Sequence, residues 1–157
     1  FGKNELILRQ GEVCRHFYYI RSGLIREFYY KNGRDITEHF SHEGNIAVCI
    51  ESLFLERPTH LMIETIEATE LWLIQCADWK TLNKQYPDIQ QLYDHSLEWM
   101  LVVSQQKADS WRFETAQERY NRFLSDYPEA AKRASIADIA SYLLMTPETL
   151  SRIRSKK

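Results

Sequence analysis

Two side chains that can form directional hydrogen bonds stand four residues apart near the C-terminal end of the chain. Glu148 and Arg152 share a face if this segment is helical, and Ser151 lies beside them. A guanidinium can bind guanine O6 and N7 together, a carboxylate can accept from cytosine N4, and a serine hydroxyl can donate or accept. The three residues therefore suit the reading of DNA bases. The alternative is an ordinary surface ion pair between Glu148 and Arg152, worth a few tenths of a kcal/mol.

Two short helices are expected to position these residues. Ser135 is a candidate cap for a helix over residues 136–143, residues 144–145 would form a turn, and Thr146 would cap a second helix that has Pro147 at its first position. This is the helix-turn-helix pattern, in which the start of the second helix enters the major groove. The glycine usual in such a turn is absent, and Leu144 stands near its place.

The second of these helices divides into an inner and an outer face. Leu150 and Ile153 are expected to pack on apolar residues of the first helix, namely Ile136, Ile139 and Leu143. Thr146, Pro147 and the base-reading residues Glu148, Ser151 and Arg152 would face outward. Hydroxyl and guanidinium groups near them could hold phosphates, which positions a protein on DNA without specifying sequence; these backbone-contact candidates are Ser135, Thr146, Thr149 and Arg154.

Charge is distributed unevenly along the chain. The formal net charge is −2, yet residues 132–157 carry six basic residues against two acidic ones, a local balance of about +4 that leaves about −6 for residues 1–131. An acidic body with a basic tip can dock that tip on a polyanion. A merely solvated basic tail is the alternative.

A long segment without glycine or proline, residues 88–113, predicts a single helix. Its apolar residues recur at three- and four-residue spacing, and Trp99, Leu101 and Val102 add apolar surface on its other sides. Such a helix needs two packing partners, which we expect to be the rest of the chain and a second copy of the helix across a two-fold axis. A buried helix in a monomer remains the alternative. The expected dimer-helix residues are Leu92, Leu97, Met100, Val103 and Trp111.

The first 75 residues have the pattern of short strands separated by turns about every ten residues, which favours an antiparallel jelly roll. Asn32-Gly33 is the strongest hairpin signal, because both residues tolerate positive φ. The aromatic run Phe28-Tyr29-Tyr30 is more typical of a strand core than of a ligand pocket. The fold class expected is thus α+β: a β-barrel, a long helix, and a C-terminal helix-turn-helix.

Several other function classes find no support. No run of residues is long and apolar enough for a membrane span, and no Ser-His-Asp arrangement, P-loop or dinucleotide fingerprint occurs, so we expect neither an enzyme nor a membrane protein. Three widely spaced cysteines, Cys14, Cys49 and Cys76, suit reduced thiols in a cytoplasm. Cys14 or Cys49 could sense redox state only if exposed with a lowered pKa.

A metal site is the main alternative for the strands. His39, His42 and Glu43 lie close in sequence, but a site would need His16 or His60 to converge on them. We expect no metal and no cofactor. The competing hypothesis for the whole chain is a jelly-roll module that binds a small molecule or metal and uses its C-terminal helices for protein contacts.

The order of these elements resembles the CRP/FNR family of bacterial transcription regulators over essentially the whole chain. The resemblance is carried by short motifs at nearly the family's spacing: Gln10-Gly11-Glu12, Tyr18-Tyr19-Ile20, Ser22-Gly23, Asn32-Gly33, Glu43-Gly44, Leu53-Phe54, Ile139-Ala140-Ser141-Tyr142-Leu143 and residues 146–152. Its Glu-x-x-Ser-Arg set at Glu148, Ser151 and Arg152 is similar to that of the FNR branch, which implies TTGA-like half-sites.

The resemblance implies a sensor barrel (1–87), a dimerisation helix (88–113) and a DNA-binding domain (114–157) that stops before the family's β-hairpin wing. It also implies double-stranded DNA, a second copy of the chain and RNA polymerase as partners. Cyclic-AMP-binding members carry a glutamate and an arginine where this chain has Cys49 and Pro58. Without the arginine a phosphate loses its strongest contact, so we expect no useful cyclic-nucleotide binding. An unknown effector would meet Cys49, Ile50, Thr59 and His60.

Overall fold

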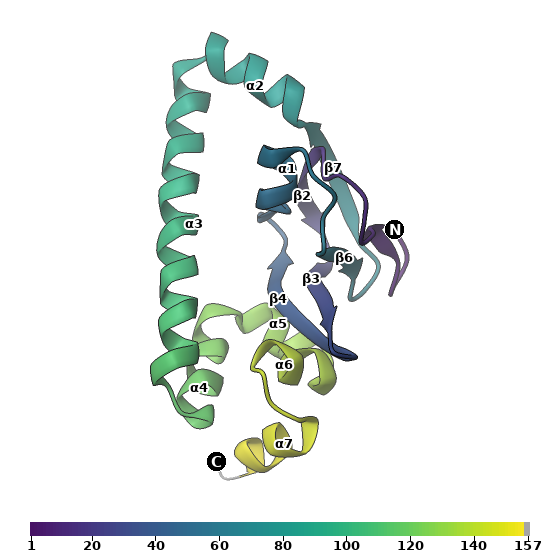
Figure 1. Ribbon diagram of the computed structural model, residues 1–157, viewed down its shortest axis with the longest axis vertical. Coiled ribbons are helices and arrows are strands. Elements are labelled where there is room, and N and C mark those ends of the chain that lie inside the picture. Colours follow the sequence, from purple (N-terminus) through teal and green to yellow (C-terminus); the bar gives the residue numbers. More distant parts are fainter. Residues whose placement is uncertain (156–157) are drawn as a thin grey trace.

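The strands of the first half of the chain form two antiparallel sheets (Figure 1). The structure is a computed structural model, and it describes residues 1–155. One sheet has the strand order β1-β6-β3-β4 and the other β5-β2-β7. We call β1–β7 with α1 the barrel; its elements are β1 (Leu6–Leu8), β2 (His16–Ser22), β3 (Leu24–Lys31), β4 (Arg34–His42), β5 (Ile46–Ala47), α1 (Ile50–Leu55), β6 (Met62–Thr65) and β7 (Glu70–Gln75).

The rest of the described chain is helical. A short helix α2 leads into the long α3, and four further helices, α4–α7, form what we call the C-terminal helices. No helix among residues 1–155 is both long and apolar enough to span a membrane. The bounds are α2 (Cys76–Gln85), α3 (Pro87–Phe113), α4 (Ala116–Asp126), α5 (Pro128–Arg133), α6 (Ile136–Tyr142) and α7 (Pro147–Ser155).

Local sequence signals account for most of these boundaries. The predicted hairpin is confirmed: Asn32 and Gly33 have φ of 53° and 73°, and Lys31 pairs with Arg34 across the turn. Thr115 begins α4 with a capping box in which its side chain and that of Glu118 satisfy each other's backbone amides. Helix α5 was not predicted from the sequence; it begins at a proline and lasts only six residues.

Two separate hydrophobic cores hold the molecule together. The first, the barrel core, lies between the two sheets and includes Ile20, Ile25 and Ile63, all 0% exposed. The second, which we call the shared core, joins Leu24 and Phe40 of the barrel to apolar residues of the C-terminal helices. The helical part of the shared core comprises Tyr120, Phe123, Ala130, Ile139, Ala140, Leu143 and Leu150.

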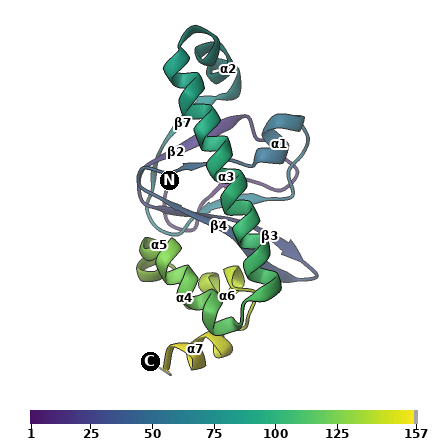
Figure 2. The ribbon, with the colours of Figure 1, turned by 90° about the vertical axis from the view of Figure 1, so that its left-hand side faces the viewer.

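The long helix α3 runs along the outside of the barrel, from α2 to the C-terminal helices (Figure 1). Figure 2, in which α3 lies in front of the barrel, shows the same course from the side. Ser110 is the one buried residue of α3, all of whose residues are described. A long helix of a globular protein normally buries an apolar stripe. Because α3 buries no apolar residue fully, it leaves much apolar surface exposed.

Candidate functional site

The turn between α6 and α7 sets the direction of the last helix. The amide of Met145 donates to the Ala140 carbonyl at 3.0 Å and that of Leu144 to Ser141 at 3.3 Å, the hydrogen bonds of a Schellman motif. Leu144 takes the left-handed position with φ of 53°, where glycine is usual. The turn therefore forms without its glycine.

The faces of α7 agree with the expected division. Leu150 is fully buried, and Ile153 packs partly buried on the shared core. The residues expected to face outward, Thr146, Pro147, Glu148, Ser151 and Arg152, are all exposed. One inner contact was wrong: Ile136 is 39% exposed, because its place in the first turn of α6 turns it away from the shared core that holds Ile139.

The surface ion pair considered as the alternative for Glu148 and Arg152 does not form. Among residues 1–155 the salt bridges do not include this pair; the Arg152 guanidinium instead donates to the Thr149 hydroxyl at 3.3 Å. Hydrogen bonds from its own backbone amide and from Thr146 lower the pKa of the Glu148 carboxyl. The Glu148 carboxylate and the Arg152 guanidinium thus stand on an open helix face without a direct contact, although the positive charge of Arg152 also favours the charged carboxylate.

The residues expected to contact a phosphate backbone differ in how free they are. Arg154 is exposed at the end of α7. Thr146 caps α7, its hydroxyl accepting from the Thr149 amide at 3.2 Å, and the Ser135 hydroxyl donates to Asp138 at 2.7 Å. The hydroxyls of Ser135 and Thr146 therefore already serve the helix starts, while Arg154 and the Arg152 guanidinium remain available.

The basic tip is smaller than the charge count indicates. Lys132 pairs with Glu129 at 2.7 Å, and Arg133 pairs with Glu43 at 3.0 Å and Glu67 at 2.9 Å. Arg133 holds the pKa of Glu43 down at about 2. Lys156 and Lys157 lie outside the described residues. Within residues 132–155, the basic side chains without a carboxylate within salt-bridge distance are thus Arg152 and Arg154 of α7.

The expected dimer-helix residues differ in how exposed they are on α3. Leu92 is 58% exposed, whereas Leu97, Met100 and Val103 are half-buried and Trp111 is partly covered by the Lys107 ammonium, 4.7 Å from its ring. Open apolar residues of α3 also form a stripe, because their separations of seven, three and eleven residues return to one face of a helix. This stripe contains Leu92, Trp99, Val102 and Phe113, which are 53–80% exposed.

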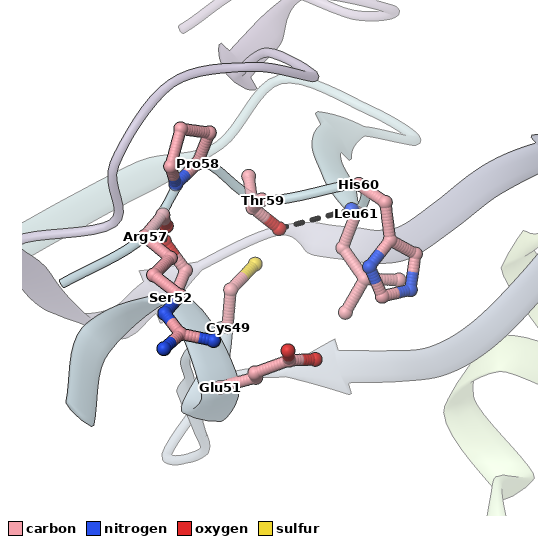
Figure 3. Close-up of a pocket in the computed structure, with 8 residues that line it drawn as sticks. All are labelled: Cys49, Glu51, Ser52, Arg57, Pro58, Thr59, His60 and Leu61. Atoms are coloured by element: carbon pink, nitrogen blue, oxygen red, sulfur yellow. Dashed lines mark hydrogen bonds between the residues drawn. The ribbon is translucent and has the colours of Figure 1, made fainter. Parts of the chain in front are cut away.

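A small hollow lies at α1 and the segment that follows it (Figure 3). Of the residues expected at an effector site, Cys49, Thr59 and His60 line it, and the exposed Ile50 does not. The cavity has a volume of about 60 Å³, against roughly 300–1,000 Å³ for ordinary ligand pockets. Its remaining lining residues are Glu51, Ser52, Arg57, Pro58 and Leu61.

The small polar groups of this hollow, on Cys49, Ser52 and Thr59, have hydrogen-bond partners within the chain. Figure 3 shows the Cys49 thiol and the Thr59 hydroxyl pointing toward each other, and that hydroxyl also accepts from the Leu61 amide at 2.9 Å. A hydrogen bond between the two thiols lowers the pKa of Cys14 and raises that of Cys49, but both thiols are buried. Arg57 was missed in the sequence; its position directly before Pro58 was the available signal.

The histidines and the glutamate considered as metal ligands have other neighbours. His39 Nδ1 lies 3.3 Å from the Tyr127 hydroxyl, and His42 Nδ1 lies 3.1 Å from the Glu43 carbonyl oxygen. The Glu43 carboxylate accepts from Arg133 and from the Gly23 amide. These side chains are therefore committed to hydrogen bonds within the chain.

Comparison with known proteins gives a family and several similar folds. The sequence pattern of the family described as cyclic nucleotide-binding domain matches residues 1–86. No curated protein sequence matches the chain. FixK2 from Bradyrhizobium japonicum is 21% identical with a TM-score of 0.84, over 99% of this chain and 81% of that chain.

Two further solved structures have the same architecture. The c-di-GMP-responsive global regulator CLP of Xanthomonas campestris is 20% identical with a TM-score of 0.76, over 99% of this chain and 83% of that one. A CRP-family transcriptional regulator from Thermus thermophilus is 18% identical with a TM-score of 0.73, over 99% of this chain and 82% of that one. At these identities the likeness shows a shared fold, which extends through the C-terminal helices.

Proposed function

The chain belongs to the cyclic nucleotide-binding domain family, and from this premise we propose that it is a sequence-specific DNA-binding transcription regulator that acts as a homodimer in the cytoplasm. The observation that carries the proposal is the outer face of α7. That face presents Glu148, Ser151 and Arg152 to solvent on a helix whose opposite side is anchored by the fully buried Leu150. The similar folds include transcription regulators, which supports the same interpretation.

The three residues would read bases by complementary hydrogen bonding. The Arg152 guanidinium would bind guanine O6 and N7, Glu148 would accept from cytosine N4, and Ser151 would donate or accept. Arg154 and the amides at the start of α7 would hold phosphates. The TTGA-like half-site stays a prediction from the resemblance to the FNR branch.

Pairing of two chains would follow from the exposed stripe on α3. The stripe exposes a contiguous apolar surface of the kind that marks interaction sites in soluble proteins. Its residues are Leu92, Trp99, Val102 and Phe113. Burial of the stripe against a second copy would remove that surface from water and bring two α7 helices onto one duplex. RNA polymerase, which the resemblance implies as a further partner, stays a prediction.

The barrel would act without a cyclic nucleotide. Its hollow is far smaller than an ordinary ligand pocket, and Cys49 and Pro58 stand where cyclic-AMP-binding members have a glutamate and an arginine. Arg57 is a cation in the same hollow, one position from the expected arginine. A different, smaller effector, or none, fits this arrangement better.

A fluorescence-anisotropy titration with duplexes tests the proposal. A palindrome of two TTGA-type half-sites should bind more tightly than a scrambled duplex of the same composition, with affinity falling steeply as salt rises. Arg152→Ala should cost about 1–3 kcal/mol on the palindrome and relax the preference at one base pair.

Arg154→Ala is the matched control on the same helix. It should weaken binding to both duplexes about equally and lower the salt dependence, because a phosphate contact carries no sequence information. If Arg152→Ala changes neither the affinity nor the base preference, the base-reading role assigned to Arg152 is wrong.

A further inference from the structure

An arginine of the barrel is buried at the start of the first helix of the helix-turn-helix. Arg26 of β3 is 6% exposed, and its guanidinium forms two hydrogen bonds with Asp35, both 2.8 Å, and one of 2.8 Å with Glu64. It also lies 3.2 Å from Oδ1 of Asp138, which belongs to α6. Arg26 therefore connects two barrel carboxylates with a carboxylate of the C-terminal helices.

Asp138 uses its two oxygens for two different tasks. Its Oδ2 accepts from the Ser135 hydroxyl at 2.7 Å and from the Ser135 amide at 3.3 Å, which completes the capping box at the start of α6. Its Oδ1 faces Arg26. A single carboxylate thus fixes both where α6 begins and where that start lies on the barrel.

Charge neutralisation alone does not require this third carboxylate. Asp35 and Glu64 already exceed the single positive charge of Arg26, so Asp138 adds negative charge to a site that is partly shielded from water. Without the guanidinium, three carboxylates would face one another across the interface and repel. The contact between Arg26 and Asp138 is therefore best explained as orientation of α6.

Neighbouring contacts limit the movement of α6 to either side of this contact. The hydroxyls of Thr37 and Ser141 lie 2.6 Å apart, one turn further along α6. Beyond them the Phe40 ring of β4 packs against the Tyr142 ring of α6 with a centroid distance of 5.8 Å, and edge-on against Phe123 of α4 at 5.9 Å. The register of α6 on β4 is thus set by polar contacts and supported by aromatic ones.

Orientation of α6 passes directly to α7. The Schellman turn and the shared burial of Ile139, Leu143 and Leu150 fix the angle between the two helices. We propose that Arg26 of the barrel is a positioning residue for the DNA-reading helix, acting through Asp138 to set the spacing between the two α7 helices of a dimer. This inference rests on the proposed function, because spacing matters only to a dimer that binds two half-sites.

The test varies the spacing between half-sites with the full chain. The palindrome of two TTGA-type half-sites is compared with duplexes that have one base pair added or removed between the half-sites. Each duplex is titrated with the unchanged protein, with Arg26→Gln and with Asp138→Asn. The unchanged protein should strongly prefer one spacing. Both variants should lower that preference roughly tenfold while keeping the preference for the half-site sequence.

A general loss of stability is separated from positioning by a control in the barrel core. Ile20→Val removes one methyl group from a fully buried site on the sheet that does not contain Arg26, and it should leave the spacing preference unchanged. Arg26→Gln combined with Asp138→Asn should alter spacing no more than either change alone, because both remove the same contact. An unchanged spacing preference in both single variants overturns the proposal.

Failure of the proposed function would be recognised separately. If the unchanged protein shows no preference for any duplex, the proposed reading of DNA sequence is wrong. Hydrogen exchange without DNA then tests whether the contact between Arg26 and Asp138 positions α6. The amides of Ile139 in α6 and of Leu143 at its C-terminal end should exchange faster in both Arg26→Gln and Asp138→Asn, with β2 and β7 unchanged. Exchange that rises equally in all elements would show that Arg26 has no specific hold on α6.

Discussion

The barrel core and the shared core are equally well buried but join different parts of the chain. Residues of the barrel core come from within the first half of the chain, whereas the shared core brings Leu24 and Phe40 against residues about a hundred positions later. Arg26, Thr37 and Glu43 add polar contacts around the shared core. The C-terminal helices are therefore packed on the barrel as part of one body, so that the barrel can determine where α7 points.

The first prediction compares the two cores by removing one aromatic ring from each. Phe40→Ala in the shared core and Phe17→Ala in the barrel core should each lower the free energy of unfolding by about 3–5 kcal/mol, measured by urea denaturation. Phe40 contacts the rings of Phe123, Tyr127 and Tyr142, and Phe17 contacts Trp79. Only Phe40→Ala should speed hydrogen exchange in α4 and α6; equal exchange in both variants would mean that the two cores are not distinct.

A second effect concerns rising pH and the barrel. Burial raises the pKa of the Glu27 carboxyl to about 8, against about 4.3 in an unfolded chain. Stability from the neutral carboxyl is full below about pH 4.3 and is lost as the pH rises through about 8. The urea midpoint should therefore fall between pH 5 and pH 8, and Glu27→Gln should remove most of that fall. A variant that retains the whole fall would show that another group is responsible.

Falling pH should instead weaken the contact between the barrel and the C-terminal helices. Burial lowers the pKa of His39, which faces the Tyr127 hydroxyl across the shared core, to about 3, against about 6.5 unfolded. Stability from neutral His39 is present above pH 6.5 and is lost as the pH falls toward 3. His39→Gln should flatten the decline of the urea midpoint between pH 6.5 and pH 4. If the midpoint of His39→Gln declines as steeply as that of the unchanged protein, His39 is not the group responsible.

The last prediction is that the barrel does not bind cyclic nucleotides. Calorimetry with cyclic AMP and with cyclic GMP should detect no binding with a dissociation constant in the low micromolar range. The hollow beside Cys49 and Pro58 is small, and it lacks an arginine at the position where cyclic-AMP-binding members have one. Low-micromolar binding would contradict this view of the barrel and would direct attention to Arg57.

Local features of the fold could be predicted from the sequence because they depend on residues close together in the chain. The Asn32-Gly33 hairpin, the Thr115 capping box and the outward face of α7 all follow from turn chemistry, capping and periodicity. The packing of α6 on β4 could not be predicted in this way, because periodicity shows that a helix has an apolar face but not what covers it.

The candidate site shows the same limit. Exposure of Glu148 and Arg152 was predictable, but the pairing of Arg133 with Glu43 and Glu67 joins residues far apart and reduced the basic surface that the sequence indicated. The contact of Asp138 with Arg26 also joins residues far apart in the sequence, so only the capping role of Asp138 could be predicted. Arg57 lies next to a position that the resemblance singled out, yet only the fold places it in the hollow.

Native mass spectrometry of the chain mixed with DNA can detect dimer binding and sequence preference in one experiment. With a palindrome of two TTGA-type half-sites and an equal amount of a scrambled duplex in the same solution, two copies of the chain should be found on each occupied palindrome, and the scrambled duplex should stay largely free. A single copy per duplex would contradict the dimer, and equal occupancy of both duplexes would contradict sequence reading by α7.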